Sequence, residues 1–216
     1  MYTDTKPIRT ESSREWLLRF GAASGVLFGL SLGVPGLIEA FTGETTVTSF
    51  IVGLGVAAFG VPALFAFHLY QADAAGRFGE VAFAVNAIGL GLFAGGSFGF
   101  NLLLFFVDDA VSDAVLDGPT MWAILGVGLA FLVGTILFGT SMARSGVMPR
   151  VAAVGYIVGL VMIGLLSQLD DSLLSSLAHV IAAASLITLS VRVWRSTSAV
   201  SRKPGTVWIE RAAPAA

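Results

Sequence analysis

The chain contains no cysteine, and this absence excludes several kinds of site at once. Without thiols it forms no disulfide, holds no iron–sulfur cluster through cysteine and attaches no haem covalently. Only two histidines are present, His68 and His179. They fall near opposite membrane faces in the topology derived below, so they are not expected to share a metal. The sequence therefore predicts no metal site and no cofactor.

Charge is also scarce. Charged residues make up 12% of the chain and hydrophobic residues 56%, whereas about a quarter of a typical soluble domain is charged. There is no dense basic patch with interleaved aromatics, so nucleic acid is not an expected partner. The sequence carries no HExxH, Gly-x-Ser-x-Gly or P-loop motif. It therefore gives no support to an enzyme and offers no catalytic residue.

Long apolar runs take the place of charge. Six runs lie at 16–38, 47–69, 81–106, 120–142, 151–168 and 173–194. A helix needs roughly 20 apolar residues to cross about 30 Å of hydrocarbon, so each run is long enough to span a bilayer. We therefore predict an all-α polytopic membrane protein. Residues 1–195 form one six-helix transmembrane domain, and residues 196–216 form a basic, disordered cytoplasmic tail.

The basic residues lie in alternate gaps between these runs. They occupy the two tails, the second loop and the fourth loop: Lys6, Arg9, Arg14, Arg19, Arg77, Arg144, Arg150, Arg192, Arg195, Arg202, Lys203 and Arg211. The other three loops carry only acids: Glu39, Glu44, Asp108, Asp109, Asp113, Asp117, Asp170 and Asp171. This positive-inside pattern predicts an N-in/C-in topology. Many Ala and Gly, with Arg preferred over Lys, indicate a prokaryotic cytoplasmic membrane. The basic side suits anionic lipid head groups.

Glycines recur at spacings of four along the predicted helices. The ladders are Gly21, Gly25, Gly29 and Gly33; Gly91, Gly95 and Gly99; and Gly155 and Gly159. Residues four apart share a helix face, and small residues let helix backbones approach closely in lipid. The ladders predict tight helix contacts. The spacing leaves open whether the partner is a helix of the same chain or of a second copy.

Polar side chains on two predicted helices are candidates for a polar interior. Asn86, Ser97 and Asn101 lie on one face of the third helix, and His179 lies on the sixth. Amides are costly in hydrocarbon, so these groups should point into the bundle. They either form interhelical hydrogen bonds or line a path for a solute or ion. We further expect Asn101 and His179 to lie at similar depth in the outer half and to face a common interior.

Two features predict interruptions of the helices. Pro35, followed by Gly36, is expected to kink or end the first helix. The segment from Asp108 to Pro119 is the longest loop, closed by a turn at 117–119.

Two short motifs resemble those of a family of uncharacterised prokaryotic six-helix membrane proteins. One is Gly76-Arg77-Phe78-Gly79, which leads into a Gly-rich helix. The other is Phe138-Gly139 followed by the segment 144–150, Arg-Ser-Gly-Val-Met-Pro-Arg. The resemblance covers roughly residues 68–164 and implies the six-helix topology. It implies no activity and no site residue.

Taken together, the sequence favours a non-catalytic accessory or oligomer-forming membrane subunit. The scarcity of charge within the helices and the glycine ladders support this interpretation. One alternative is a small channel or transporter with a polar path lined by the third and sixth helices. A second alternative is a binder of lipid or another lipophilic ligand. A continuous polar cavity favours the first alternative, and an apolar groove open to lipid favours the second.

Overall fold

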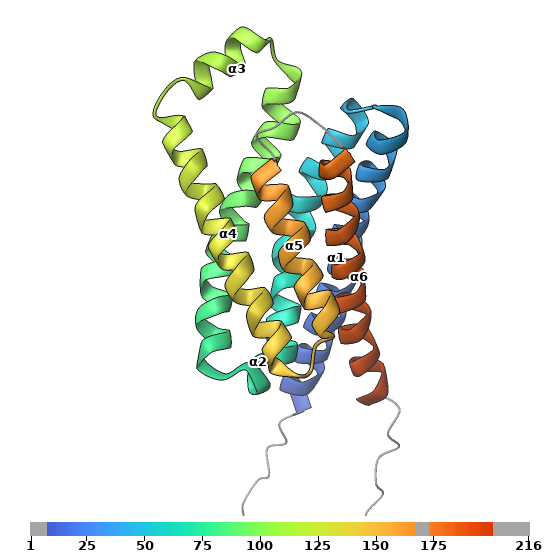
Figure 1. Cartoon of the computed structure of the whole chain (residues 1–216). Helices are drawn as coiled ribbons and strands as arrows, with labels where there is room; N and C mark the ends of the chain where they lie inside the picture. The colour runs from blue at the N-terminus through green and yellow to red at the C-terminus, as the bar shows by residue number, and fades with distance from the viewer. Residues whose placement is uncertain (1–7, 167–172, 201–216) are drawn as a thin grey trace, which may run out of the picture.

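The computed structural model describes residues 8–166 and 173–200, and within these ranges every element is a helix. The long helices are α1 (Ile8–Thr42), α2 (Thr46–Phe98), α4 (Thr120–Ser145), α5 (Arg150–Leu166) and α6 (Leu173–Val200) (Figure 1). A π-helix, η1 (Gly99–Leu103), a 3-10 turn, η2 (Leu104–Phe106), and a short helix, α3 (Asp109–Leu116), connect α2 to α4. The predicted all-helical fold is confirmed.

The helix α2 is two helices joined by one residue. Gly76 has φ 56° and ψ −157°, a backbone conformation that glycine adopts without the steric penalty of a side chain. The chain reverses direction there, so α2 consists of a first half, residues 46–75, and a second half, residues 77–98. Counting both halves, the fold has the six long helices that the sequence predicts.

Length and hydropathy agree with this count. Four segments are long and apolar enough to cross a membrane: Ser13–Thr42, Thr46–Phe106, Thr120–Ser145 and Leu173–Ser198. The second of these contains both halves of α2, and α5 is a shorter apolar helix.

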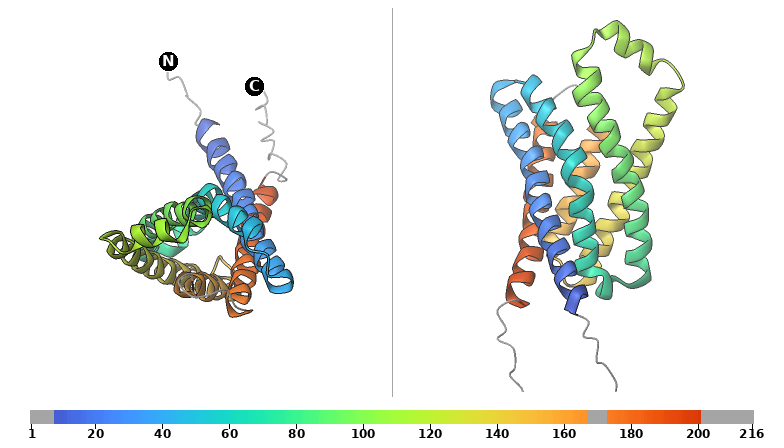
Figure 2. Two further views of the ribbon diagram at one scale, coloured as in Figure 1. Left: turned by 90° about the horizontal axis from the view of Figure 1, so that it is seen from above. Right: turned by 180° about the vertical axis from the view of Figure 1, so that it is seen from behind.

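The six long helices form a closed ring (Figure 2). The order around the ring is α1, the first half of α2, the second half of α2, α4, α5 and α6, which returns to α1. Large buried side chains from all parts of the ring fill its interior, among them Phe28, Phe67, Leu90, Phe131, Tyr156 and Leu186. The first and last helices of the chain are therefore neighbours.

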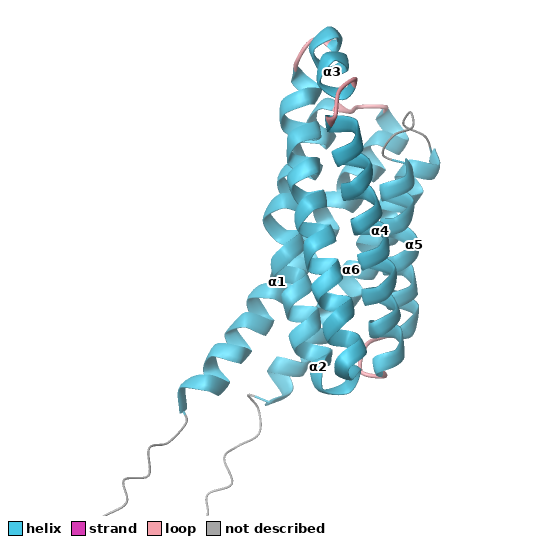
Figure 3. Cartoon of the chain, turned by 90° about the vertical axis from the view of Figure 1, so that its left-hand side faces the viewer, coloured by secondary structure: helices cyan, strands magenta, loops and turns pink. Residues whose placement is uncertain are grey.

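Both described ends of the chain lie at one end of the ring, with the Gly76 turn and the turn at 146–149 (Figure 1). We call this the inner end. The turn at 43–45 and the helix α3 lie at the opposite, outer end. The start of α1 leans away from the other helices at the inner end (Figure 3).

A glycine lies at every junction of the ring. A Cβ added at these positions would contact the neighbouring helix: Gly21 at Ala66, Gly53 at Leu102, Gly89 at Ala130, Gly139 at Ile157, Gly159 at Ala182 and Gly29 at Ile187. Close backbone approach of this kind is what small residues permit.

The glycines of the ladder on α1 contact two neighbouring helices rather than one. Gly21 lies against the first half of α2, whereas Gly25, Gly29 and Gly33 lie against α6. A step of four residues rotates the helix face by about 40°, because an α-helix has 3.6 residues per turn. Four glycines in series therefore sweep from one neighbour to the next.

The ladder that begins on the second half of α2 and ends at Gly99 in η1 faces away from the other helices. No heavy atom of another described helix lies within 4 Å of a Cβ added at Gly91, Gly95 or Gly99. Gly155 and Gly159, in contrast, both lie against α6. Equal spacing in the sequence thus corresponds to two different environments.

Serine hydroxyls fill several of the glycine sites. Gly25 faces Ser190, Gly55 faces Ser31 and Gly155 faces Ser185. Each hydroxyl donates to a carbonyl of its own helix: Ser190 to Leu186 at 2.7 Å, Ser31 to Phe28 at 2.8 Å and Ser185 to Ile181 at 2.8 Å. Each hydroxyl therefore has its hydrogen-bond acceptor on its own helix and needs none from the helix that carries the glycine.

Three local features differ from the sequence prediction. The helix α1 continues past Pro35 to Thr42, and neighbouring helices and local adjustments allow proline in such helices. The predicted long loop contains the helix α3, whose eight residues are too few to form a long apolar run. The helix α6 extends to Val200, inside the segment predicted as a tail. The rest of that segment, and Asp170–Asp171, lie outside the described residues.

Candidate functional site

Asn86 forms a hydrogen bond across the interior of the ring. Its amide nitrogen Nδ2 donates to the hydroxyl of Tyr156 on α5 at 2.9 Å. Both side chains are buried, with Asn86 fully enclosed and Tyr156 2% exposed. The second half of α2 and α5 are not adjacent in the ring, so this bond joins two helices that α4 separates.

Tyr156 was not among the residues predicted from the sequence. A tyrosine hydroxyl in an apolar helix needs a hydrogen-bond partner when it is buried, and that requirement was the available signal. Its partner is separated from it by 70 residues in the chain.

Gly134 of α4 lies against Asn86, and Thr135 follows it on the same helix. Gly134 leaves room for the amide, because a Cβ added there would lie 3.0 Å from Asn86 Oδ1 and 2.6 Å from its Cα. Thr135, the next residue, is fully buried. We call Asn86, Thr135 and Tyr156 the central polar cluster.

Ser97 and Asn101 bond to each other within their own segment. Asn101 Nδ2 lies 2.9 Å from the Ser97 carbonyl and 3.3 Å from its hydroxyl. Asn101 sits in the π-helix η1, and its Cβ lies close to Gly53 on the first half of α2. The amide thus caps a local irregularity of the backbone.

His179 also bonds within its own helix. Its Nδ1 lies 2.9 Å from the Ser175 carbonyl, and its Cβ packs against Gly36 on α1. Gly36 and Gly53 flank the outer turn at 43–45, so the two lie toward the outer end. Asn101 nevertheless packs beside the first half of α2, whereas His179 packs beside α1. No hydrogen bond described in the structure joins the two side chains.

The space at the centre of the ring is apolar. It is lined by Phe28, Gly60, Ala63, Leu64, Phe67, Leu90, Tyr156 and Leu186, and it admits no sphere of the size of a water molecule. Ser97, Asn101 and His179 do not line it. The four predicted polar residues are therefore distributed over three separate hydrogen-bonding groups.

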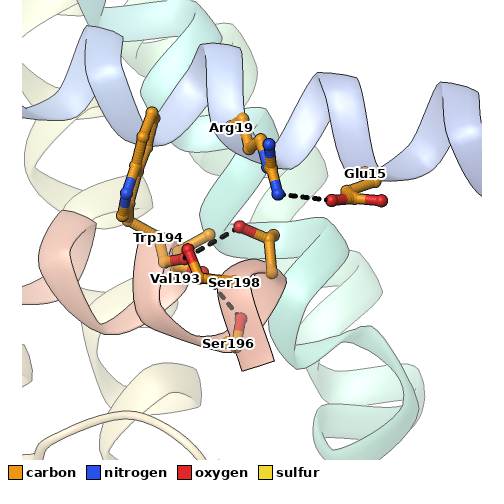
Figure 4. Close-up of polar contacts among 7 residues, drawn as sticks. Glu15, Arg19, Val193, Trp194, Ser196 and Ser198 are labelled. Atoms are coloured by element: carbon orange, nitrogen blue, oxygen red, sulfur yellow. Dashed lines mark hydrogen bonds and ion pairs between the residues drawn. The ribbon is translucent and has the colours of Figure 1, made fainter. Parts of the chain in front are cut away.

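The inner end carries a second set of polar contacts. Gln71 Nε2 approaches the Ser141 hydroxyl at 3.5 Å, and both side chains are buried. Arg19 pairs with Glu15 at 2.6 Å on the start of α1, near the end of α6 where Trp194 lies (Figure 4). Arg14 donates to the Leu69 carbonyl at 3.0 Å. The bond of Arg14 joins α1 to the first half of α2, the bond of Gln71 joins the first half of α2 to α4, and the Arg19–Glu15 pair lies within α1.

Within the described ranges, no three His, Asp or Glu side chains are grouped so that they could hold a metal ion. No protein-family model matches the chain, and comparison with curated proteins and with solved structures likewise gives no match. The fold itself defines the class: an all-helical ring of six long apolar helices.

Proposed function

We propose that the protein is a six-span integral membrane protein with both termini in the cytoplasm. The distribution of charge over the two ends of the ring supports this topology. The segments that meet at the inner end carry arginines, whereas the charged residues of the turn at 43–45 and of the segment 107–119 at the outer end are all acids. The arginines include Arg14, Arg19, Arg77, Arg144, Arg150, Arg192 and Arg195, and the acids are Glu44, Asp108, Asp109, Asp113 and Asp117. Basic residues remain on the cytoplasmic side during insertion.

Exposed tryptophans add a second line of support. Trp16 lies near the start of α1 and Trp194 near the end of α6, with 62% and 46% of their surface exposed, and Trp122 lies at the start of α4 with 77% exposed. Tryptophan is enriched at both membrane–water interfaces. Membrane lipids are then the partners of the outer surface of the ring, in a prokaryotic cytoplasmic membrane.

Single cysteines test the topology against a background that contains no other thiol. Ala114→Cys, on α3, is expected to react with an impermeant maleimide in intact cells, because its side chain is exposed at the outer end. Ser145→Cys, at the end of α4, is expected to react only after lysis. Labelling of Ser145→Cys in intact cells contradicts the proposed orientation.

Within this class, we propose a non-catalytic subunit that associates with a second copy through the outward glycine face. This face consists of Gly91, Gly95 and Gly99 with the exposed Ile88 and Leu92 beside them. The observation that carries the proposal is the open space beside all three glycines. Glycines at a spacing of four on a lipid-facing helix allow close helix pairing between chains.

The arrangement of polar groups favours this function over a channel or transporter. Asn86, Asn101 and His179 each hydrogen-bond at a separate place, and the central space is apolar and too small for water. A path for an ion or polar solute needs connected polar groups with water between them. The apolar interior of the ring instead favours a subunit without a path for ions or polar solutes.

Disulfide cross-linking in membranes tests the association. Gly95→Cys is expected to form a covalent dimer on oxidation, because in the proposed pairing Gly95 of one copy lies close to Gly95 of the second copy. Ala184→Cys, which is exposed on α6, is the matched control and should remain monomeric. Equal cross-linking at the two positions rejects the outward glycine face as the contact.

Loss of association should leave the fold intact. Gly95→Leu is expected to abolish the dimer in cross-linking at a second position, Gly91→Cys, with an unchanged melting temperature. The added side chain meets no other described helix, so the bundle itself is not disturbed.

A further inference from the structure

The central polar cluster contains two oxygen atoms that have no partner in the described structure. They are Asn86 Oδ1 and Thr135 Oγ1, and both belong to side chains that are fully enclosed. A buried polar atom without a hydrogen bond destabilises the folded state, because it loses its contact with water and gains no partner. Two such atoms on adjacent helices therefore call for a ligand or a rearrangement.

The two atoms lie at the same depth by independent counts along two helices. Asn86 follows Arg77 by nine residues, and Thr135 precedes Arg144 by nine. At 1.5 Å per residue both are about 14 Å from the inner end. The close approach of Gly134 to the Asn86 backbone and amide fixes the two helices in this register.

The orientation of α4 turns Thr135 toward the other two members of the cluster. Gly134 faces Asn86 on the second half of α2. Gly139 lies one turn beyond Thr135 and faces α5, since a Cβ added at Gly139 would lie 3.3 Å from Tyr156 Cδ1. Thr135 lies between these two directions on the helix. It therefore points into the angle between the second half of α2 and α5, where the Asn86–Tyr156 bond lies.

The available valences define what can bind there. Asn86 Oδ1 only accepts, the threonine hydroxyl donates once and accepts twice, and the Tyr156 hydroxyl keeps a proton to donate after accepting from Asn86. The neighbouring central space offers no partner, because its lining is apolar apart from Tyr156. A water molecule, with two donors and two acceptors, satisfies all three groups.

We propose that Asn86, Thr135 and Tyr156 bind one water molecule between the second half of α2, α4 and α5, beside the apolar central space and not within it. The water donates to Asn86 Oδ1, exchanges a hydrogen bond with Thr135 and accepts from Tyr156. Buried waters typically make about three hydrogen bonds to polar groups that would otherwise be unsatisfied. The site connects α2, α4 and α5 through one ligand, and it stands independently of the proposed association.

Radiolytic hydroxyl labelling in ¹⁸O-water tests the site directly, because a short X-ray pulse splits bound water and modifies the side chain beside it. We expect Tyr156 to incorporate ¹⁸O in protein held in lipid nanodiscs, although it is 2% exposed. Phe67 is 1% exposed and lines the apolar space, so it should stay unmodified. A Tyr156 as unreactive as Phe67, after correction for intrinsic reactivity, overturns the proposal.

A variant of α4 assigns the water to this cluster. Thr135→Val removes the hydroxyl and keeps the shape, so Tyr156 labelling should fall severalfold. Ser190→Ala removes a buried hydroxyl elsewhere and should leave Tyr156 labelling unchanged. Unchanged labelling in Thr135→Val, or a structure of the protein in which Thr135 donates directly to the Phe131 carbonyl or to Asn86 with no water between them, rejects the site. The wild-type measurement decides the matter even if the variant does not fold.

Discussion

Replacing Gly159 with leucine is expected to destabilise the folded protein strongly. A Cβ at this position would lie 2.5 Å from the Ala182 amide nitrogen and 2.7 Å from its Cα. Both atoms belong to the backbone of α6, which has no rotamer to change, so α5 and α6 must move apart. Overpacking of a well-packed interior costs about 1–3 kcal/mol and occasionally more. The measurement is the melting temperature of the purified protein in detergent.

Gly126→Leu provides the matched control on α4. No heavy atom of another described helix lies within 4 Å of a Cβ added at Gly126, and leucine is compatible with a lipid-facing surface. Its melting temperature should therefore equal that of the wild type. Equal melting temperatures for Gly159→Leu and the wild type contradict a close contact between α5 and α6.

The second large effect concerns the pairing of Gly25 with Ser190. A Cβ at Gly25 would overlap the Ser190 hydroxyl and lie 3.2 Å from Phe67 Cζ. Gly25→Ala is therefore expected to lower the free energy of unfolding by disturbing the α1–α6 junction. Ser190→Gly should restore part of the loss in the double variant, because it removes the atom that the new methyl group meets.

A double-mutant cycle measures this pairing. Residues in direct contact typically show coupling energies of about 0.5–3 kcal/mol, and the sign here should be compensating. Ser185→Gly, also on α6, faces Gly155 rather than Gly25 and serves as the control, with effects that simply add. Additive effects for Gly25→Ala and Ser190→Gly as well would show that the two residues do not meet.

The number and approximate limits of the helices followed from the sequence because they depend on local properties. Apolar runs separated by charged or turn residues define segments of a given length, whatever their neighbours. The reversal between the two halves of α2 was expected within residues 70–80 by the same reasoning, since Arg77 interrupts the apolar sequence, and the structure confines it to Gly76. The helix α3 was missed because eight residues with two acids, flanked by Asp108 and Asp117, resemble a loop.

The rotation of each helix could not be derived in the same way. Gly25 and Gly95 belong to ladders of identical spacing, yet one lies against α6 and the other faces outward. A spacing of four shows that residues share a face, but the order of helices around the ring decides what that face meets. The pairing of Asn86 with Tyr156 depends on the same long-range order, and for that reason the polar residues on α2 were identified without their partner.

The junction between α1 and α6 has a consequence for the order of events during synthesis. A ribosome delivers α1 first and α6 last, so the side of α1 that carries Gly25, Gly29 and Gly33 has no protein neighbour until translation is almost complete. Every other junction joins segments that are consecutive among the six and can form as the chain emerges. The ring is consequently open through nearly all of its biogenesis, and a nascent chain truncated before α6 retains an uncovered seam along its first helix.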